Sequence, residues 1–147
     1  MIVYKKKKDE FLADVDSGEI GDIVSRVVSL RLGIRVGASE KASWANSLEY
    51  MSQVLAPDDV STDSQVAIEY RIPRTSNRID FLVAGQGSDG SSNLVIIELK
   101  QWSKAEKTME DGIVRTALGR GIRSAVHPSY QAWSYASLLS GFNEAVH

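Results

Sequence analysis

An apolar run in the second half of the chain ends in two charged residues. It reads Leu94-Val95-Ile96-Ile97-Glu98-Leu99-Lys100. A continuous run of this length, rich in β-branched residues, predicts a buried β-strand. Because side chains alternate along a strand, Glu98 and Lys100 should share one face while Leu99 points to the other. Two charged groups at the end of a buried strand need compensation, which makes this strand end a candidate functional site.

Two more strands are predicted upstream of this run. Residues 66–72 alternate between apolar and polar positions with a period of two, which is typical of a strand. Residues 78–83 form a second apolar segment that contains one carboxylate, Asp80. The connections, residues 73–77 and 85–93, are short and carry turn-forming residues. Three strands connected in this way predict an antiparallel meander whose charges lie on one face.

Two helices are predicted ahead of these strands. The first should end at Gly33, and its apolar residues recur at helical spacing: Ile20, Ile23, Val24, Val27, Val28 and Leu32. Ser39 is the predicted N-cap of the second helix, which Pro57 should terminate. In this second helix, Glu40 suits the dipole of the first turn, and Glu49 is expected on a solvated flank rather than in a catalytic role.

A last helix is expected to start at Pro128 or Ser129 and to end at Gly141. Gln131 and Tyr135 lie one turn apart on it and therefore face the same way. Taken alone, Tyr135 would be an ordinary core residue and Gln131 an amide on the helix surface. Helices and strands in this order predict an α/β fold.

The pattern weakens between residues 101 and 128, where basic residues are interspersed with glycines: Lys104, Lys107, Arg115, Arg120 and Arg123. We expect a flexible or partly ordered lid in this region. Its cations could contact phosphates, and an ordinary solvated loop is the alternative. The four lysines at positions 5–8 are most simply a solvated approach to a helix, with nucleic-acid contact as the other interpretation.

Composition indicates an ordinary globular chain and excludes several kinds of site. At 147 residues, with 43% hydrophobic and 24% charged residues, the chain suits a single domain, 1–147. It has no cysteine, so disulfides and thiolate metal sites are excluded. Neither His127 nor His147 has a partner at metal-ligand spacing, and no phosphate-binding loop is present, so neither zinc nor ATP hydrolysis is expected. Without a signal peptide or a membrane-spanning stretch, we expect a cytoplasmic protein.

Asp80, the Glu98-x-Lys100 triplet and the later Gln131-x-x-x-Tyr135 pair together resemble the PD-(D/E)XK nuclease superfamily, in its RecB-like branch. The sequence around these motifs is similar to the N-terminal nuclease-like region of bacterial proteins that continue into a superfamily-one helicase. The resemblance implies a restriction-endonuclease-like core, with a central mixed sheet flanked by helices. A final strand of that core is missing, so we expect either the N-terminal part of a longer chain or an edge supplied by residues 1–4.

The resemblance also implies a chemistry. Asp80 and Glu98 would hold Mg²⁺ or Mn²⁺, joined by the backbone carbonyl of Leu99. Lys100 would position the attacking water or the phosphate. Gln131 would orient the water or a metal ligand, and Tyr135 would hydrogen-bond or pack beside the substrate.

The expected substrate is nucleic acid, with DNA favoured over RNA, and the expected partner is a helicase domain on the same longer chain. Two alternatives remain. One is a non-cleaving module that binds nucleic acid or docks on a helicase. The other is a structural ion pair between Glu98 and Lys100, with Asp80 capping a turn.

Overall fold

The computed structural model describes residues 3–142 of the chain, so His147 lies outside the described part. Its α/β fold forms two compact units, the first ending at Ile97 and the second beginning at Glu98. Within the described residues, there are four helices and two sheets, and every strand pair is antiparallel. The expected mixed sheet is therefore wrong for this part of the chain. None of the helices described is long and apolar enough to cross a lipid bilayer.

The first unit is built on a four-stranded sheet in the order β1-β2-β3-β4. Its strands are β1 (Tyr4–Lys7), β2 (Gln65–Arg71), β3 (Arg78–Gln86) and β4 (Ser92–Ile97). The predicted antiparallel meander is confirmed in β2, β3 and β4, which pair in sequence order. The expectation of an edge near residues 1–4 is close to the outcome, since β1 pairs with β2 at the edge of this sheet, although residues 1 and 2 are not described.

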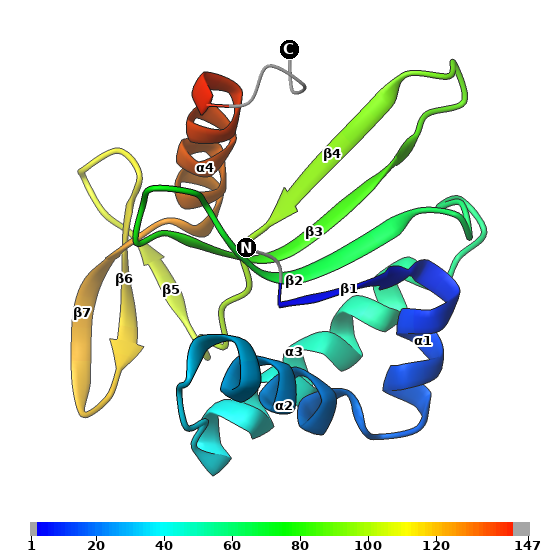
Figure 1. Ribbon diagram of the computed structural model, residues 1–147. Helices are drawn as coiled ribbons and strands as arrows, with labels where there is room; N and C mark the ends of the chain where they lie inside the picture. Colours follow the sequence, from blue (N-terminus) through cyan, green and yellow to red (C-terminus); the bar gives the residue numbers. More distant parts are fainter. Residues whose placement is uncertain (1–2, 143–147) are drawn as a thin grey trace. The chain divides into compact units, whose positions relative to one another are not determined.

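Three helices gather beside β1 and β2 in the first unit: α1 (Lys8–Asp16), α2 (Ile20–Leu32) and α3 (Ala38–Leu55) (Figure 1). They bury large apolar side chains against the sheet. The Phe11 and Phe81 rings, both fully buried, meet edge to face with their centroids 5.5 Å apart. Edge-to-face contact suits the quadrupoles of two aromatic rings, so this pair joins α1 to the centre of the sheet.

The sequence located α2 correctly and α3 nearly so. Gly33 follows α2 in a left-handed conformation (φ 66°), which glycine adopts without a Cβ penalty, and its N–H donates to the carbonyl of Ser29. The predicted Ser39 cap of α3 is wrong, because the helix starts at Ala38 and its N-cap is Gly37, two residues before Ser39. The end is correct, since the last helical residue lies two positions before Pro57.

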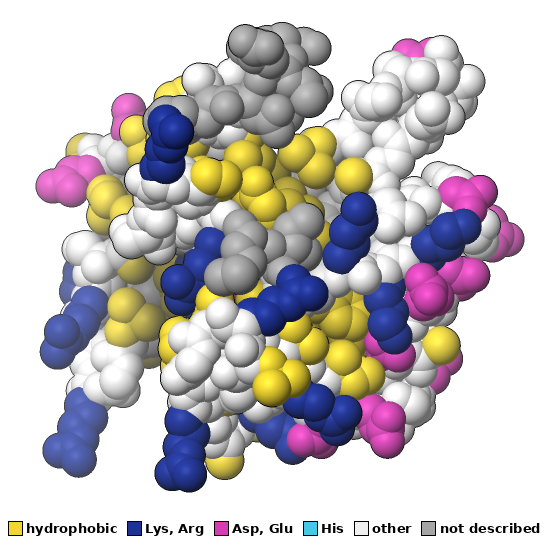
Figure 2. All heavy atoms as spheres, in the orientation of Figure 1, with side chains coloured by type: hydrophobic (Ala, Val, Ile, Leu, Met, Phe, Trp, Pro, Cys, Tyr) yellow, Lys and Arg dark blue, Asp and Glu magenta, His cyan; other side chains and the backbone are white. Residues whose placement is uncertain are grey.

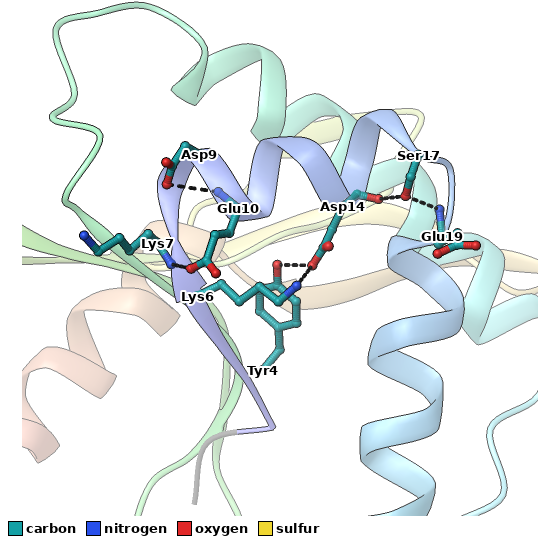
Figure 3. Close-up of polar contacts among 8 residues, drawn as sticks. All are labelled: Tyr4, Lys6, Lys7, Asp9, Glu10, Asp14, Ser17 and Glu19. Atoms are coloured by element: carbon teal, nitrogen blue, oxygen red, sulfur yellow. Dashed lines mark hydrogen bonds and ion pairs between the residues drawn. The ribbon is translucent and has the colours of Figure 1, made fainter.

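The N-terminal lysines lead into α1 as expected, and Lys5 and Lys7 are exposed, whereas the expected solvation is wrong for Lys8, which is buried. They form β1 and the start of α1, and acidic side chains partner two of them. The carboxylate of Asp14 accepts a hydrogen bond from the Tyr4 hydroxyl (2.8 Å) and pairs with Lys6 (2.6 Å) (Figure 3). Lys7 pairs with Asp63 at 2.7 Å.

Lys8 has only 2% of its surface exposed. Its ammonium donates to two carbonyl oxygens in the loop after α3, those of Pro57 (2.8 Å) and Val60 (2.6 Å). These bonds satisfy a buried charge and tie the loop to α1, which is why a lysine can occupy this position.

The strand β4 is shorter and more exposed than predicted. It ends at Ile97, so Glu98 and Lys100 follow the strand instead of lying within it. The side chains of Leu94 and Val95 are 40% and 52% exposed. The expectation of a fully buried strand fails because β4 lies at the edge of its sheet, with a single strand neighbour among the described residues.

The second unit contains a three-stranded sheet followed by a helix: β5 (Ala105–Lys107), β6 (Ile113–Leu118), β7 (Gly121–Val126) and α4 (Pro128–Phe142). The predicted lid is therefore wrong. Along β6, Val114 and Thr116 are buried while Arg115 between them is exposed, as a period of two requires. The start of α4 at Pro128 is confirmed, and the helix continues one residue past Gly141.

We predict that Lys8→Met lowers the free energy of unfolding by about 2–4 kcal/mol, because methionine keeps the aliphatic stem but removes the donor from two carbonyls. Urea denaturation followed by circular dichroism measures this change. Lys5→Met is the matched control at an exposed position, and it should stay within about 0.5 kcal/mol of the unaltered protein. Equal unfolding midpoints for the two variants would show that the Lys8 contacts carry no net stability.

Candidate functional site

The second unit brings four of the predicted site residues into one hydrogen-bonded network, centred on Glu98. The Glu98 side chain is 3% exposed. Its Oε1 accepts from the Lys100 ammonium at 2.5 Å and from the Gln131 amide Nε2 at 2.6 Å. Glu98 and Lys100 come from the segment after β4, whereas Gln131 comes from α4, 33 residues from Glu98. A carboxylate held by two donors from separate segments has a fixed position and orientation.

The helix α4 places the side-chain amide of Gln131 beside the carboxylate of Glu98. Pro128 begins the helix with a fixed φ, and His127 accepts the Ser129 N–H on its Nδ1 at 3.1 Å. Gln131 follows in the first turn. Its Nε2 also donates to the hydroxyl of Tyr135 at 2.7 Å. The prediction that Gln131 and Tyr135 face the same way is therefore confirmed.

Both hydrogens of the Gln131 amide nitrogen are used, one on Glu98 and one on Tyr135. Tyr135 is 7% exposed and belongs to the buried set of the chain, so its ring anchors the amide from the core side. Lys100 is the most exposed member of the network, with 26% of its side chain accessible. Its ammonium has three donors, so it can hold Glu98 and still reach an anion from the solvent side.

Asp80 belongs to the first unit, in β3, and Glu98 to the second. Within the sheet of the first unit, Phe81 pairs with Ile97, and these are the residues next to Asp80 and Glu98 in the sequence. That Asp80 and Glu98 share a cation, with the carbonyl of Leu99, stays a prediction. Among residues 3–142 no group of three or more His, Cys, Asp or Glu side chains is arranged to hold a metal ion.

The first unit contains a buried carboxylate, that of Glu69, whose burial was not predicted from the sequence. Glu69 lies on β2, is 2% exposed, and has a positive φ of 57°, which is uncommon for a residue other than glycine. Its Oε1 accepts from the Trp44 indole N–H at 2.9 Å, and its Oε2 pairs with the Arg78 guanidinium at 2.7 Å. One feature of the sequence could have indicated this buried group, namely an acidic residue within a strongly apolar strand. The alternation of the strand placed Glu69 on the polar face instead.

Burial raises the pKa of the Glu69 carboxyl to about 7, and the negative charges of Asp80 and Glu40 act in the same direction. The guanidinium of Arg78 and the indole of Trp44 oppose this shift, because both favour the charged carboxylate. Glu69 therefore changes charge near neutral pH, on the strand paired with the one that carries Asp80.

The two other acidic residues considered from the sequence lie as expected. Glu49 is exposed on α3, and Glu40 is in the first turn of that helix.

Comparisons with known protein families, with curated proteins and with solved structures found no match to this chain.

We predict that the stability of Glu69→Gln relative to the unaltered protein rises as the pH increases from about 5 to 8. The folded Glu69 keeps its proton up to about pH 7, whereas the unfolded one releases it near its ordinary value of 4.5. Between these values the folded state binds more protons, so the unaltered protein loses stability as the pH rises, and glutamine cannot.

The difference between the two unfolding free energies should change by about 2–3 kcal/mol over this range, measured by urea denaturation at each pH. Glu49→Gln is the control, because it makes the same change at an exposed carboxylate. A constant difference for Glu69→Gln would mean that the carboxylate is charged throughout.

Proposed function

We propose that this chain is a divalent-metal-dependent nuclease domain of the PD-(D/E)XK type, which hydrolyses phosphodiester bonds of nucleic acid. The observation that carries the proposal is the network on Glu98. A structural ion pair needs Glu98 and Lys100 alone. Here an amide from a distant helix also holds the carboxylate, and a buried tyrosine in turn holds that amide. Such layered support is typical of carboxylates that must keep one geometry for binding a ligand.

Each residue has a role that suits its place in the network. Lys100, partly exposed beside Glu98, orients the attacking water or offsets charge on the phosphoryl oxygens. Gln131 fixes the rotamer of Glu98, so the carboxylate need not reorganise when the substrate arrives. Tyr135 fixes Gln131 through its hydroxyl and packs in the core, so it acts as a positioning residue.

Glu98 and Asp80, with the Leu99 carbonyl, would hold Mg²⁺ or Mn²⁺. These oxygen donors fit such a hard cation, which proteins commonly bind through one or two carboxylates together with water and substrate phosphate. When bound, the cation supplies a hydroxide-like nucleophile and neutralises charge on the phosphate. The Glu98 side chain is almost fully buried and already pairs with one cation, the ammonium of Lys100, so positive charge is favourable beside it.

The order of two features along the chain supports the proposal, although the sheets are antiparallel and not mixed. An antiparallel meander precedes the Glu98 segment, and the helix with Gln131 and Tyr135 follows it. We further propose that a helicase domain on the same longer chain is the natural partner, as the resemblance implies. A second candidate is a non-cleaving module that binds nucleic acid, which the direct 2.5 Å pairing of Lys100 with Glu98 favours.

We predict that the unaltered chain cuts DNA in Mg²⁺ or Mn²⁺ and that a chelator abolishes the cutting. Glu98→Gln and Lys100→Met should each lower the rate by at least about 100-fold, because each removes a charge that acts in the transition state. Tyr135→Phe should lower the cleavage rate by about tenfold, which is a typical loss for a residue that orients a metal ligand without binding the metal itself. Linear, circular and single-stranded substrates, resolved on gels, give the rates.

Matched controls separate the site from charge alone. Glu110→Gln and Lys5→Met remove one charge each from exposed positions outside the network, and both should keep the full rate. Circular dichroism and thermal unfolding show whether each variant is folded. If the unaltered chain binds DNA but never cuts it in either metal, the non-cleaving module is correct and the nuclease proposal is wrong.

A further inference from the structure

In the second unit, the β6–β7 hairpin, residues 113–126, carries charges of one sign only. It carries Arg115, Arg120 and Arg123 and has no acidic residue, although the whole chain has a net charge of −2. All three arginines are exposed. In the view of Figure 2, Lys and Arg side chains stand out from the part of the surface that the hairpin forms.

The strand register distributes the three arginines over both faces and the tip of the ribbon. Arg115 pairs with Ser124, whereas Arg123 pairs with Thr116, so the two arginines lie on opposite faces. Arg120 is in the two-residue turn that joins the strands, after Gly119 in a left-handed conformation (φ 61°). Glycine as the first turn residue is the pattern of a tight hairpin turn whose twist matches its strands.

The three arginines do not form ion pairs with acidic side chains in the described part of the chain. None of the three is among the ion pairs of residues 3–142. Glu106 lies opposite Arg115 on the neighbouring strand, but its carboxylate pairs with Lys104 at 2.6 Å. The hairpin therefore presents three guanidinium groups outside any of these ion pairs, with Glu106 acting on Arg115 through its charge, and each guanidinium is able to bind a phosphate through two parallel hydrogen bonds.

We propose that the β6–β7 hairpin enters the major groove of double-stranded DNA, with Arg120 at the leading tip and Arg115 and Arg123 contacting phosphates on the two walls. This inference names the substrate class of the nuclease and so rests on the proposed function. The strand β5 pairs with β6 only as far as Thr116, so the end of the hairpin, residues 117–122, is a two-stranded ribbon, with Arg115 and Arg123 at its base. The major groove of B-form DNA is wide enough for such a ribbon. Charge on both faces suits a groove that is lined by phosphates on both sides.

Other nucleic acids suit this hairpin less well. The major groove of an RNA duplex is deep and narrow, so a ribbon cannot enter it. Surfaces that bind single strands usually stack bases on aromatic side chains, and residues 113–126 contain no Phe, Tyr or Trp. Duplex DNA is the occupant that the groove width, the charge and the absence of aromatic residues favour together.

Binding is measured without cleavage, by fluorescence anisotropy of a labelled 20-base-pair duplex in EDTA. We expect Arg115→Gln/Arg120→Gln/Arg123→Gln to weaken duplex binding at least about tenfold at 0.1 M salt. The slope of log affinity against log salt should fall by about 2–3, as expected for the loss of three phosphate contacts. The unaltered chain should bind duplex DNA more tightly than single-stranded DNA or an RNA duplex of the same sequence.

Two controls separate the hairpin and its groove from general charge. Lys5→Gln/Arg26→Gln/Arg35→Gln removes the same charge from exposed positions in the first unit and should change the affinity less than twofold. Bulky sugars attached to cytosine in the major groove should weaken binding, whereas a ligand filling the minor groove should not.

The hairpin proposal is wrong if the unaltered chain does not bind duplex DNA, if the two triple variants lose equal affinity, or if the RNA duplex binds as tightly as DNA. Because EDTA prevents metal-dependent cutting, these results are independent of the nuclease assay. A chain that binds through the hairpin but never cuts would refute the proposed function alone. Cutting that survives loss of the hairpin arginines, with unchanged affinity, would refute this inference alone.

Discussion

One buried carboxylate, that of Glu98, constrains the second unit. A charge with 3% of its side chain exposed is costly unless donors replace the lost water. Lys100 supplies the opposite charge, and Gln131 supplies an amide that is itself fixed by Tyr135. The segment after β4 and the helix α4 must therefore keep their positions for the carboxylate to keep both donors. The contacts that compensate the burial of Glu98 also fix the orientation of its carboxylate, on which the proposed chemistry depends.

The first unit contains a contrasting acidic group. Glu69 is as deeply buried as Glu98, yet its donors are a neutral indole and a guanidinium on a side chain that is 40% exposed. That compensation is incomplete, so burial keeps the pKa of Glu69 near neutrality. Burial and the partners of the carboxylate together set the pKa of Glu69, and burial has the larger effect. Because Asp80 contributes to the shift of Glu69, the charge of one affects the other.

The sequence predicted the elements whose signals are local. The apolar spacing of α2, the left-handed Gly33 after it and the proline at the start of α4 all depend on neighbouring residues, and each prediction is confirmed. The contact of Gln131 with Glu98 came from a resemblance, since periodicity alone places Gln131 on a helix surface. The β5–β7 sheet was missed because arginine, serine and threonine obscure its alternation, and the burial of Lys8 was missed because two distant carbonyls cause it.

We propose that Asp80 and Glu98 bind one divalent cation, and Mn²⁺ binding tests this proposal most directly. Electron paramagnetic resonance counts free Mn²⁺ during titration of the unaltered chain, of Asp80→Asn and of Glu98→Gln. The account predicts one bound ion per unaltered chain and its loss in each variant, because two carboxylates are the protein's charged ligands to the ion. If Asp80→Asn holds Mn²⁺ as tightly as the unaltered chain, or if the unaltered chain binds none, the account is contradicted.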